Sequence, residues 1–157
     1  MTFTEYCRDF LDYDRWATRR TIESLRGLAG PDEGLRLLGH LLAARSVWLV
    51  RISGGDTSLL TVWPEWSLAE CEERLNTVHA EWSAYLGTLD DGAIDSLRTY
   101  RTIAGAEFST SLRDILTQVN NHGTYHRGQI ARIVRERGGM AASTDFIFYA
   151  RAGRGEA

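Results

Sequence analysis

Four long stretches of this 157-residue chain repeat their apolar residues at spacings of three and four. This spacing gathers apolar side chains on one face of an α-helix, and each such face must be buried against another element. The stretches run from Phe3 to about Leu28, from Leu37 to Ile52, from Ser67 to Leu89, and from about Ser111 to Ile133. The pattern therefore predicts an all-α protein built as a four-helix bundle.

The starts of two helices carry a capping box. Thr2 precedes Glu5 by three residues, and Ser67 precedes Glu70 in the same way; in this pattern each side chain satisfies a free backbone N–H group of the other residue. The connection between the first two helices, which ends at Pro31, is short. We therefore expect these two helices to be antiparallel neighbours.

The two later connections, residues 55–66 and 90–110, are long enough to cross the bundle. In the second, residues 96–103 and 107–109 flank a turn at Gly105, which fits either a small hairpin before the last helix or an extended excursion. After the last helix we expect residues 145–149 to pack as a short segment and the tail beyond about residue 150 to fray. Residues 1–157 are expected to form a single domain.

The charge composition excludes several classes of function. The net charge is -3, and all 18 basic residues are arginine. Nucleic-acid binding usually requires a basic excess, so it is disfavoured. Because the sequence contains no lysine, it has neither a Schiff-base lysine nor the lysine of a phosphate-binding P-loop.

The two cysteines and the N-terminus complete this general description. Cys7 and Cys71 match no zinc or redox spacing and fall in amphipathic segments, so we expect buried thiols. The N-terminus lacks a basic region followed by an apolar stretch, and no segment is apolar enough to span a membrane. The sequence favours a cytoplasmic protein.

Three histidines occupy positions that the helical pattern reserves for core residues. His122 and His126 are four residues apart and lie one above the other on the last helix, and His40 lies in the second. Three neutral imidazoles could bind one divalent metal and leave a coordination position open, as in catalytic sites. Such a donor set suits zinc, nickel or iron(II). The alternative is that each histidine is a packed, hydrogen-bonded core residue.

The residues near these histidines argue against two known kinds of metal site. Gly123, Thr124 and Tyr125 separate the pair, so the glutamate of a His-Glu-x-x-His metalloprotease is missing. No carboxylate neighbours the pair, which argues against a di-iron site. His79, beside the apolar stripe of the third helix, is expected to be a boundary or surface residue rather than a fourth ligand.

The stretch from His122 to Ile130, HGTYHRGQI, resembles the C-terminal signature of the DinB-like (DinB/YfiT) four-helix-bundle metalloproteins. The resemblance extends to residues 40–54, to residues 13–17 and to Asp145-Phe146. It implies an up-down-down-up bundle, a divalent metal bound by three histidines, which are His40, His122 and His126 here, and a homodimer. Better understood relatives are similar to metal-dependent transferases and isomerases that use a low-molecular-weight thiol such as mycothiol or bacillithiol.

Together with the three histidines, the resemblance implies a metal-dependent thiol S-transferase or related detoxification enzyme that acts on a small molecule, without nucleic acid or membrane. A hydrolase using metal-bound hydroxide and a non-catalytic metal-binding or interaction protein stay open. Asn121, Tyr125 and Gln129 surround the pair and could orient the ligating rings. No residue is assigned as a general base.

Two further features of the sequence bear on a substrate. Arg45 and Arg51 could steer an anionic co-substrate, although solvated helix-surface charges are the preferred interpretation. The apolar segment from Leu59 to Trp66 could roof a pocket, pack against its own bundle or form a dimer contact, and packing is preferred.

Overall fold

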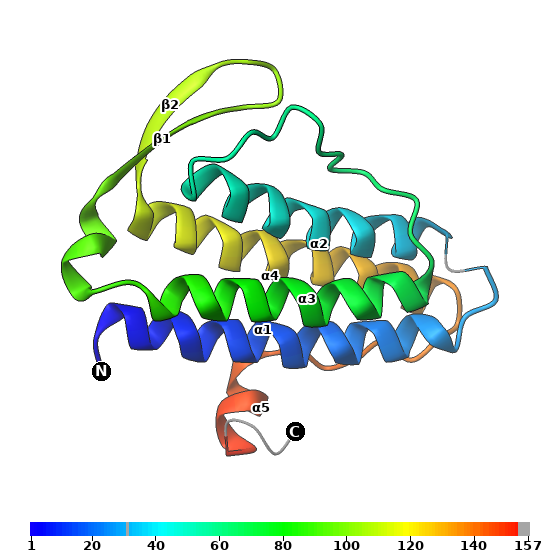
Figure 1. Ribbon diagram of the computed structural model, residues 1–157. Helices are drawn as coiled ribbons and strands as arrows, with labels where there is room; N and C mark the ends of the chain where they lie inside the picture. The colour runs from blue at the N-terminus through cyan, green and yellow to red at the C-terminus, as the bar shows by residue number, and fades with distance from the viewer. Residues whose placement is uncertain (31, 154–157) are drawn as a thin grey trace.

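Four long helices, a β-hairpin and a short C-terminal helix make up the computed structural model, which describes residues 1–30 and 32–153 (Figure 1). The long helices are α1 (Phe3–Arg26), α2 (Asp32–Ile52), α3 (Leu68–Gly87) and α4 (Leu112–Glu136). A 3-10 turn, η1 (Asp91–Asp95), leads into the hairpin strands β1 (Leu97–Arg101) and β2 (Glu107–Ser111), and the chain closes with α5 (Phe146–Arg151). The predicted all-α bundle with a small hairpin before the last helix is therefore confirmed.

The helices run up, down, down and up, because α2 and α3 are parallel to each other and antiparallel to α1 and α4 (Figure 1). Both α1 and α2 pack against α3 and α4, so α1 and α2 lie diagonally across the bundle. The expectation that α1 and α2 are direct neighbours is wrong, although their antiparallel direction is right. Five residues of extended chain reach about 16 Å, which is long enough for a short connection to span a diagonal.

The parallel direction of α2 and α3 forces the connection between them to run back along the bundle. Residues 53–67, which we call the crossover, follow the length of α2 before α3 begins (Figure 1). The chain leaves α2 through Gly54, whose φ of 77° lies in the left-handed region that glycine adopts without strain. The crossover thereby comes to lie over the middle of α2, where it contributes to the site described below.

Both predicted capping boxes are present. The Thr2 side chain accepts from the Glu5 backbone while the Glu5 side chain accepts from the Thr2 backbone. The same reciprocal pair joins Ser67 and Glu70 at the start of α3. These bonds fix where the two helices begin, because they satisfy N–H groups that have no partner within the helix.

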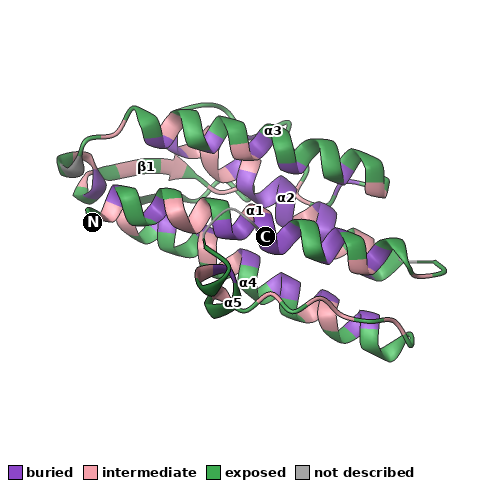
Figure 2. Ribbon diagram, turned by 90° about the horizontal axis from the view of Figure 1, so that it is seen from below, coloured by how far each residue is buried: buried purple, intermediate pink, exposed green. Residues whose placement is uncertain are grey.

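The core fills the space between the four helices, and the buried positions follow the inward faces in Figure 2. A second, aromatic cluster joins α5 to the outside of α1, where Phe146 stacks on Phe10 at 5.6 Å and Tyr149 is buried beside Tyr13 and Trp16. Of residues 145–149, Phe146 and Tyr149 pack as predicted, whereas Ile147 and Phe148 are exposed. Most of the tail expected to fray, residues 154–157, lies outside the described residues.

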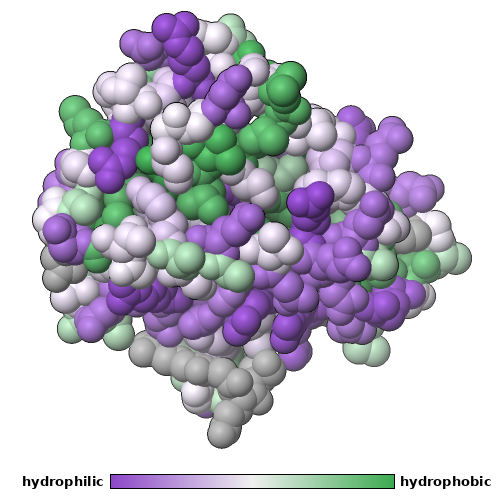
Figure 3. Space-filling view, viewed as in Figure 1, coloured by the Kyte–Doolittle hydropathy of each residue, from purple (hydrophilic) through white to green (hydrophobic). Residues whose placement is uncertain are grey.

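Cys7 and Cys71 are buried free thiols, as expected, and burial raises their pKa values to about 11 and about 12. Within the described part of the chain, no helix combines the length and the apolar character needed to cross a membrane. In Figure 3 hydrophobic side chains gather over the hairpin and the crossover, whereas hydrophilic side chains dominate over α1 and α3.

Candidate metal centre

The fold brings the three histidines together between α2 and α4. His40 comes from α2, His122 and His126 come from α4, and each offers one ligand atom so that all three atoms lie within 4.8 Å of one another. The ring centroids are 4.4 Å apart for the α4 pair, and His40 lies 5.1 Å from His122 and 4.8 Å from His126. This group could hold a metal ion.

Hydrogen bonds fix which nitrogens face the centre. Nδ1 of His40 lies 2.7 Å from the carbonyl oxygen of Val62, and Nδ1 of His126 lies 2.7 Å from Oε1 of Gln129. Both oxygens can only accept, so each Nδ1 carries the proton and each Nε2 is unprotonated. In His126 this Nε2 accepts a hydrogen bond from Nε2 of His122. Outward hydrogen bonds of this kind orient metal-binding histidines in many proteins.

The nitrogen spacing fits a shared metal. Nε2 of His122 lies 3.1 Å from Nε2 of His126. Two imidazole nitrogens bound to one tetrahedral zinc ion at about 2.0–2.1 Å would lie about 3.3 Å apart. The α4 pair is therefore already close to the separation that a shared ion requires.

The surroundings keep two of the imidazoles neutral. Burial is the main cause that lowers the pKa of His122 to about 4, and the neighbouring His126, His40 and Arg45 lower it further. Burial also lowers the pKa of His126, while its hydrogen bond to Gln129 acts in the opposite direction. Neutral imidazole is the form that binds metal, so protons compete weakly for these two ligands.

Trp63 of the crossover covers one face of His40. The two rings stack at 3.9 Å with an interplanar angle of 12°, and the Arg36 guanidinium lies 4.9 Å from the centroid of Trp63. Cavities of about 560 Å³ and about 190 Å³ both include Trp63 in their walls, and the smaller one also includes Gln129. The crossover thus forms part of a pocket wall as well as packing on the bundle.

The three residues predicted to orient the ligands differ in their placement. Gln129 bonds to His126, and the ring of Tyr125 contacts His126 edge-on at 5.2 Å while its side chain stays 64% exposed. Asn121 is exposed, and within the described residues it makes no hydrogen bond to any histidine. His79 is outside the centre and bonds to Asp12 at 2.9 Å.

A buried charge network, which the sequence did not indicate, lies beside His122 and Gly123 of α4. Arg45 of α2 and Arg127 of α4 both pair with Oδ1 of Asp14 of α1, the second at 2.5 Å. The side chains of Asp14 and Arg45 are 4% exposed and that of Arg127 is 1% exposed. The interpretation of Arg45 as a solvated charge is therefore wrong, and its pairing with Asp14 removes it from co-substrate binding.

Gly123 makes room for this network inside α4. A Cβ atom at Gly123 would lie 2.8 Å from Oδ1 of Asp14, 2.9 Å from Nη2 of Arg45 and 3.1 Å from Nη1 of Arg127. Cβ atoms in folded proteins essentially never come as close as the first two distances, and the third is tighter than most Cβ contacts. Position 123, between the two α4 histidines, is therefore a glycine because any side chain there would crowd these three charged residues.

Comparison with known proteins places this site in a family. The model of the DinB family matches residues 32–156, which include all three histidines. The chain belongs to the DinB family. The resemblance carried by the HGTYHRGQI stretch is thereby confirmed.

Two known proteins show how far the similarity of this chain to other DinB proteins extends. Protein DinB of Bacillus subtilis (strain 168) is 45% identical over 40 residues, a segment covering 26% of this chain and only 23% of that protein. A crystal structure of a DinB-like protein from Bacillus cereus ATCC 10987 matches with a TM-score of 0.54 at 17% identity and covers 85% of this chain and 94% of that one. The second match shows a shared fold.

Replacing Gly123 by alanine should lower the free energy of unfolding by about 1–3 kcal/mol, the usual cost of overpacking a well-packed core. The matched control is Gly128→Ala on the same helix, where an added Cβ meets no atom within 4 Å. That control should stabilise the protein by about 0.5–1 kcal/mol through helix propensity. Urea unfolding of both variants checks this, and equal effects would contradict the close packing around Gly123.

The stability of metal-free protein should fall as the pH is lowered from about 6.5 toward about 4. In this window the unfolded chain takes up a proton at residue 122, whereas folded His122, with its pKa of about 4, does not. Unfolding midpoints in urea across this range, in the presence of a chelator, measure the effect. His122→Asn should show a shallower loss, and parallel curves for the two proteins would contradict the lowered pKa.

Proposed function

We propose that this protein is a metal-dependent enzyme that joins a low-molecular-weight thiol to an electrophilic small molecule, with zinc, nickel or iron(II) held by His40, His122 and His126. The observation that carries the proposal is the convergence of three imidazole nitrogens within 4.8 Å. Two of these rings have their other nitrogen occupied by an oxygen acceptor. Membership of the DinB family supports metal binding but specifies no reaction.

The donor set supports both the choice of metal and an open position. Imidazole nitrogens suit zinc, nickel and iron(II), whereas magnesium and calcium prefer oxygen ligands. Three protein ligands leave at least one coordination position for a small molecule. A metal bound there would lower the pKa of a thiol or water at that position, making thiolate or hydroxide available near neutral pH.

The residues around the centre contribute binding and orientation. Val62 and Gln129 hold the two ring orientations, and Trp63 presents an aromatic wall beside the ligands. In the transfer, the thiol loses its proton to solvent and its sulfur forms a bond to an electrophilic carbon. The leaving group departs from that carbon with the bonding electron pair. Of the two cavities that share Trp63, the one of about 560 Å³ is of a size that suits a small substrate.

Purified untagged protein loaded with zinc, nickel or iron(II) should retain one equivalent of one of these metals after desalting. His40→Ala, His122→Ala and His126→Ala should each lose it, because two remaining imidazoles bind far more weakly than three. Metal content is measured by mass spectrometry. Wild-type protein that stays metal-free with every ion would overturn the proposed metal centre.

Three further variants test which neighbouring residues affect metal affinity, and two of them are controls. Gln129→Leu removes the bond to Nδ1 of His126 and should lower metal affinity about 10–100-fold. Asn121→Leu, at an exposed position without that contact, should leave the affinity unchanged. His79→Ala should also leave it unchanged, because His79 bonds to Asp12 outside the centre.

Metal-loaded protein should accelerate the loss of a model electrophile, such as an activated aryl chloride, only when a low-molecular-weight thiol is present. The assay compares mycothiol, bacillithiol and no thiol, and follows both free thiol and released chloride. His40→Ala should reduce the rate to that of metal-free protein, whereas His79→Ala should not. Consumption of electrophilic substrate without any thiol would indicate a hydrolase instead, and no turnover with intact metal binding would indicate a binding protein.

A further inference from the structure

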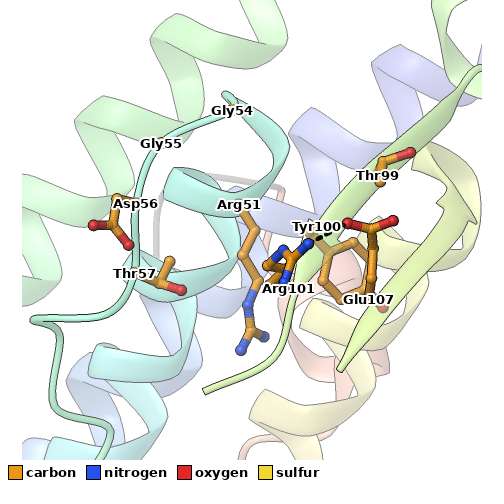
Figure 4. A pocket seen from close by; sticks show the side chains of 9 residues that line it. All are labelled: Arg51, Gly54, Gly55, Asp56, Thr57, Thr99, Tyr100, Arg101 and Glu107. Carbon is orange, nitrogen blue, oxygen red and sulfur yellow. Dashed lines mark hydrogen bonds and ion pairs between the residues drawn. The ribbon is translucent and has the colours of Figure 1, made fainter. Parts of the chain in front are cut away.

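A separate cavity of about 350 Å³ lies at the hairpin end of α2 (Figure 4). Its walls come from the end of α2, from the start of the crossover and from both hairpin strands. The side chain of Arg51 extends between the crossover and β1, and Thr57 faces it across the space (Figure 4). No part of the metal centre lines this cavity.

Aromatic contacts hold Arg51 in place. Its guanidinium lies 4.8 Å from the ring centroid of Trp48 and 5.6 Å from that of Tyr100, and these two rings meet edge-on at 5.1 Å. A guanidinium that already lies against two rings loses little further conformational freedom when it binds a ligand. Arg51 is therefore a preorganised cation.

Among the described residues, the Arg51 guanidinium has no hydrogen-bond or ion-pair partner. Its Nε is buried without a hydrogen bond, and within the described residues no carboxylate lies within ion-pairing distance of the side chain. Burial lowers the pKa of Arg51, yet arginine stays protonated in proteins. The partial loss of hydration around this charge is thus not offset by an internal anion.

The other charged groups of the cavity are already engaged. Arg101 pairs with Glu107 at 3.1 Å across the hairpin. The Asp56 carboxylate accepts bonds from the backbone N–H and the hydroxyl of Ser58, each at 2.8 Å. Arg51 is consequently the cation of this cavity that is left available to a ligand.

We propose that this cavity binds a small molecule through a carboxylate or phosphate group, with the Arg51 guanidinium donating the hydrogen bonds. The planar fork of guanidinium N–H groups matches both kinds of anion. The volume of about 350 Å³ accommodates a small metabolite rather than a macromolecular segment.

The proposed anion site is distinct from the metal centre. His40 and Arg51 are separated by 51 − 40 = 11 residues on α2, which is about three helical turns or about 16 Å. Because no metal ligand lines the cavity, we expect loss of the metal to leave the anion site intact.

Arginine side-chain NMR tests the proposal directly. Protein labelled with ¹⁵N is titrated with phosphate, pyrophosphate or malonate at constant ionic strength, and chloride serves as the reference anion. The Nε–H signal of Arg51 and the indole signal of Trp48 should shift saturably, with a dissociation constant in the millimolar range or tighter, about −4 kcal/mol or more favourable. Saturation by malonate or by phosphate identifies which anion class is bound. Shifts that do not saturate, or that chloride reproduces, would overturn the site.

The variants separate the role of Arg51 from a general effect of charge. Arg51→Gln should abolish the saturable shift of Trp48, and Arg51→Lys should keep a weaker one. The matched control is Arg74→Gln, which removes another guanidinium stacked on a tryptophan, at 5.2 Å from Trp66, outside this cavity. Equal loss in that control would overturn the assignment, whereas His40→Ala should leave anion binding intact.

Discussion

One carboxylate, that of Asp14, connects three of the four helices through the two arginines that meet at its Oδ1. Its Oδ2 has no hydrogen-bond partner within the described residues, so the network is held by charge attraction more than by complete hydrogen bonding. Removing one member of a buried ion pair usually costs about 3–5 kcal/mol, because the remaining charge is left uncompensated. The spacing of α1, α2 and α4 at the level of the histidines depends on this contact, and Gly123 is the backbone position that accommodates it.

The direction of α3 determines what covers the metal centre. Because α2 and α3 are parallel, the crossover has to travel back along α2, and this path brings Val62 and Trp63 to His40. A bundle with a short α2–α3 turn would leave the same histidine without its carbonyl acceptor and without its aromatic cover. The topology therefore supplies the hydrogen-bond acceptor and the aromatic cover of His40, whereas the acceptor of His126, Gln129, comes from α4 itself.

The sequence was sufficient for the helices and for the stacked pair of His122 and His126, because both follow from helical spacing, whereas His40 was joined to that pair through its core position and the family resemblance. The same spacing separates Gln129, which bonds to His126, from Asn121, which does not. Gln129 lies three residues after His126 and shares its side of the helix, whereas Asn121 lies one residue before His122 and is rotated by about 100°. Helical periodicity cannot pair residues from different helices, however. The contact of Arg45 with Asp14 and the stacking of Trp63 on His40 could therefore be seen only in the structure.

Arg45 and Arg51 show why one partly or fully buried arginine stabilises the fold while another is available to bind a ligand. Both belong to α2, and both lose contact with water, but only Arg45 meets an internal carboxylate. The same distinction applies within the metal centre, where the outward nitrogens of His40 and His126 meet oxygen acceptors and their inward nitrogens converge on one another. Burying a polar group is costly unless it finds a partner. Arg45 finds its partner in Asp14, and this contact holds helices together. Arg51 faces a cavity and the three histidines face one another, so in both places the missing partner points to a ligand.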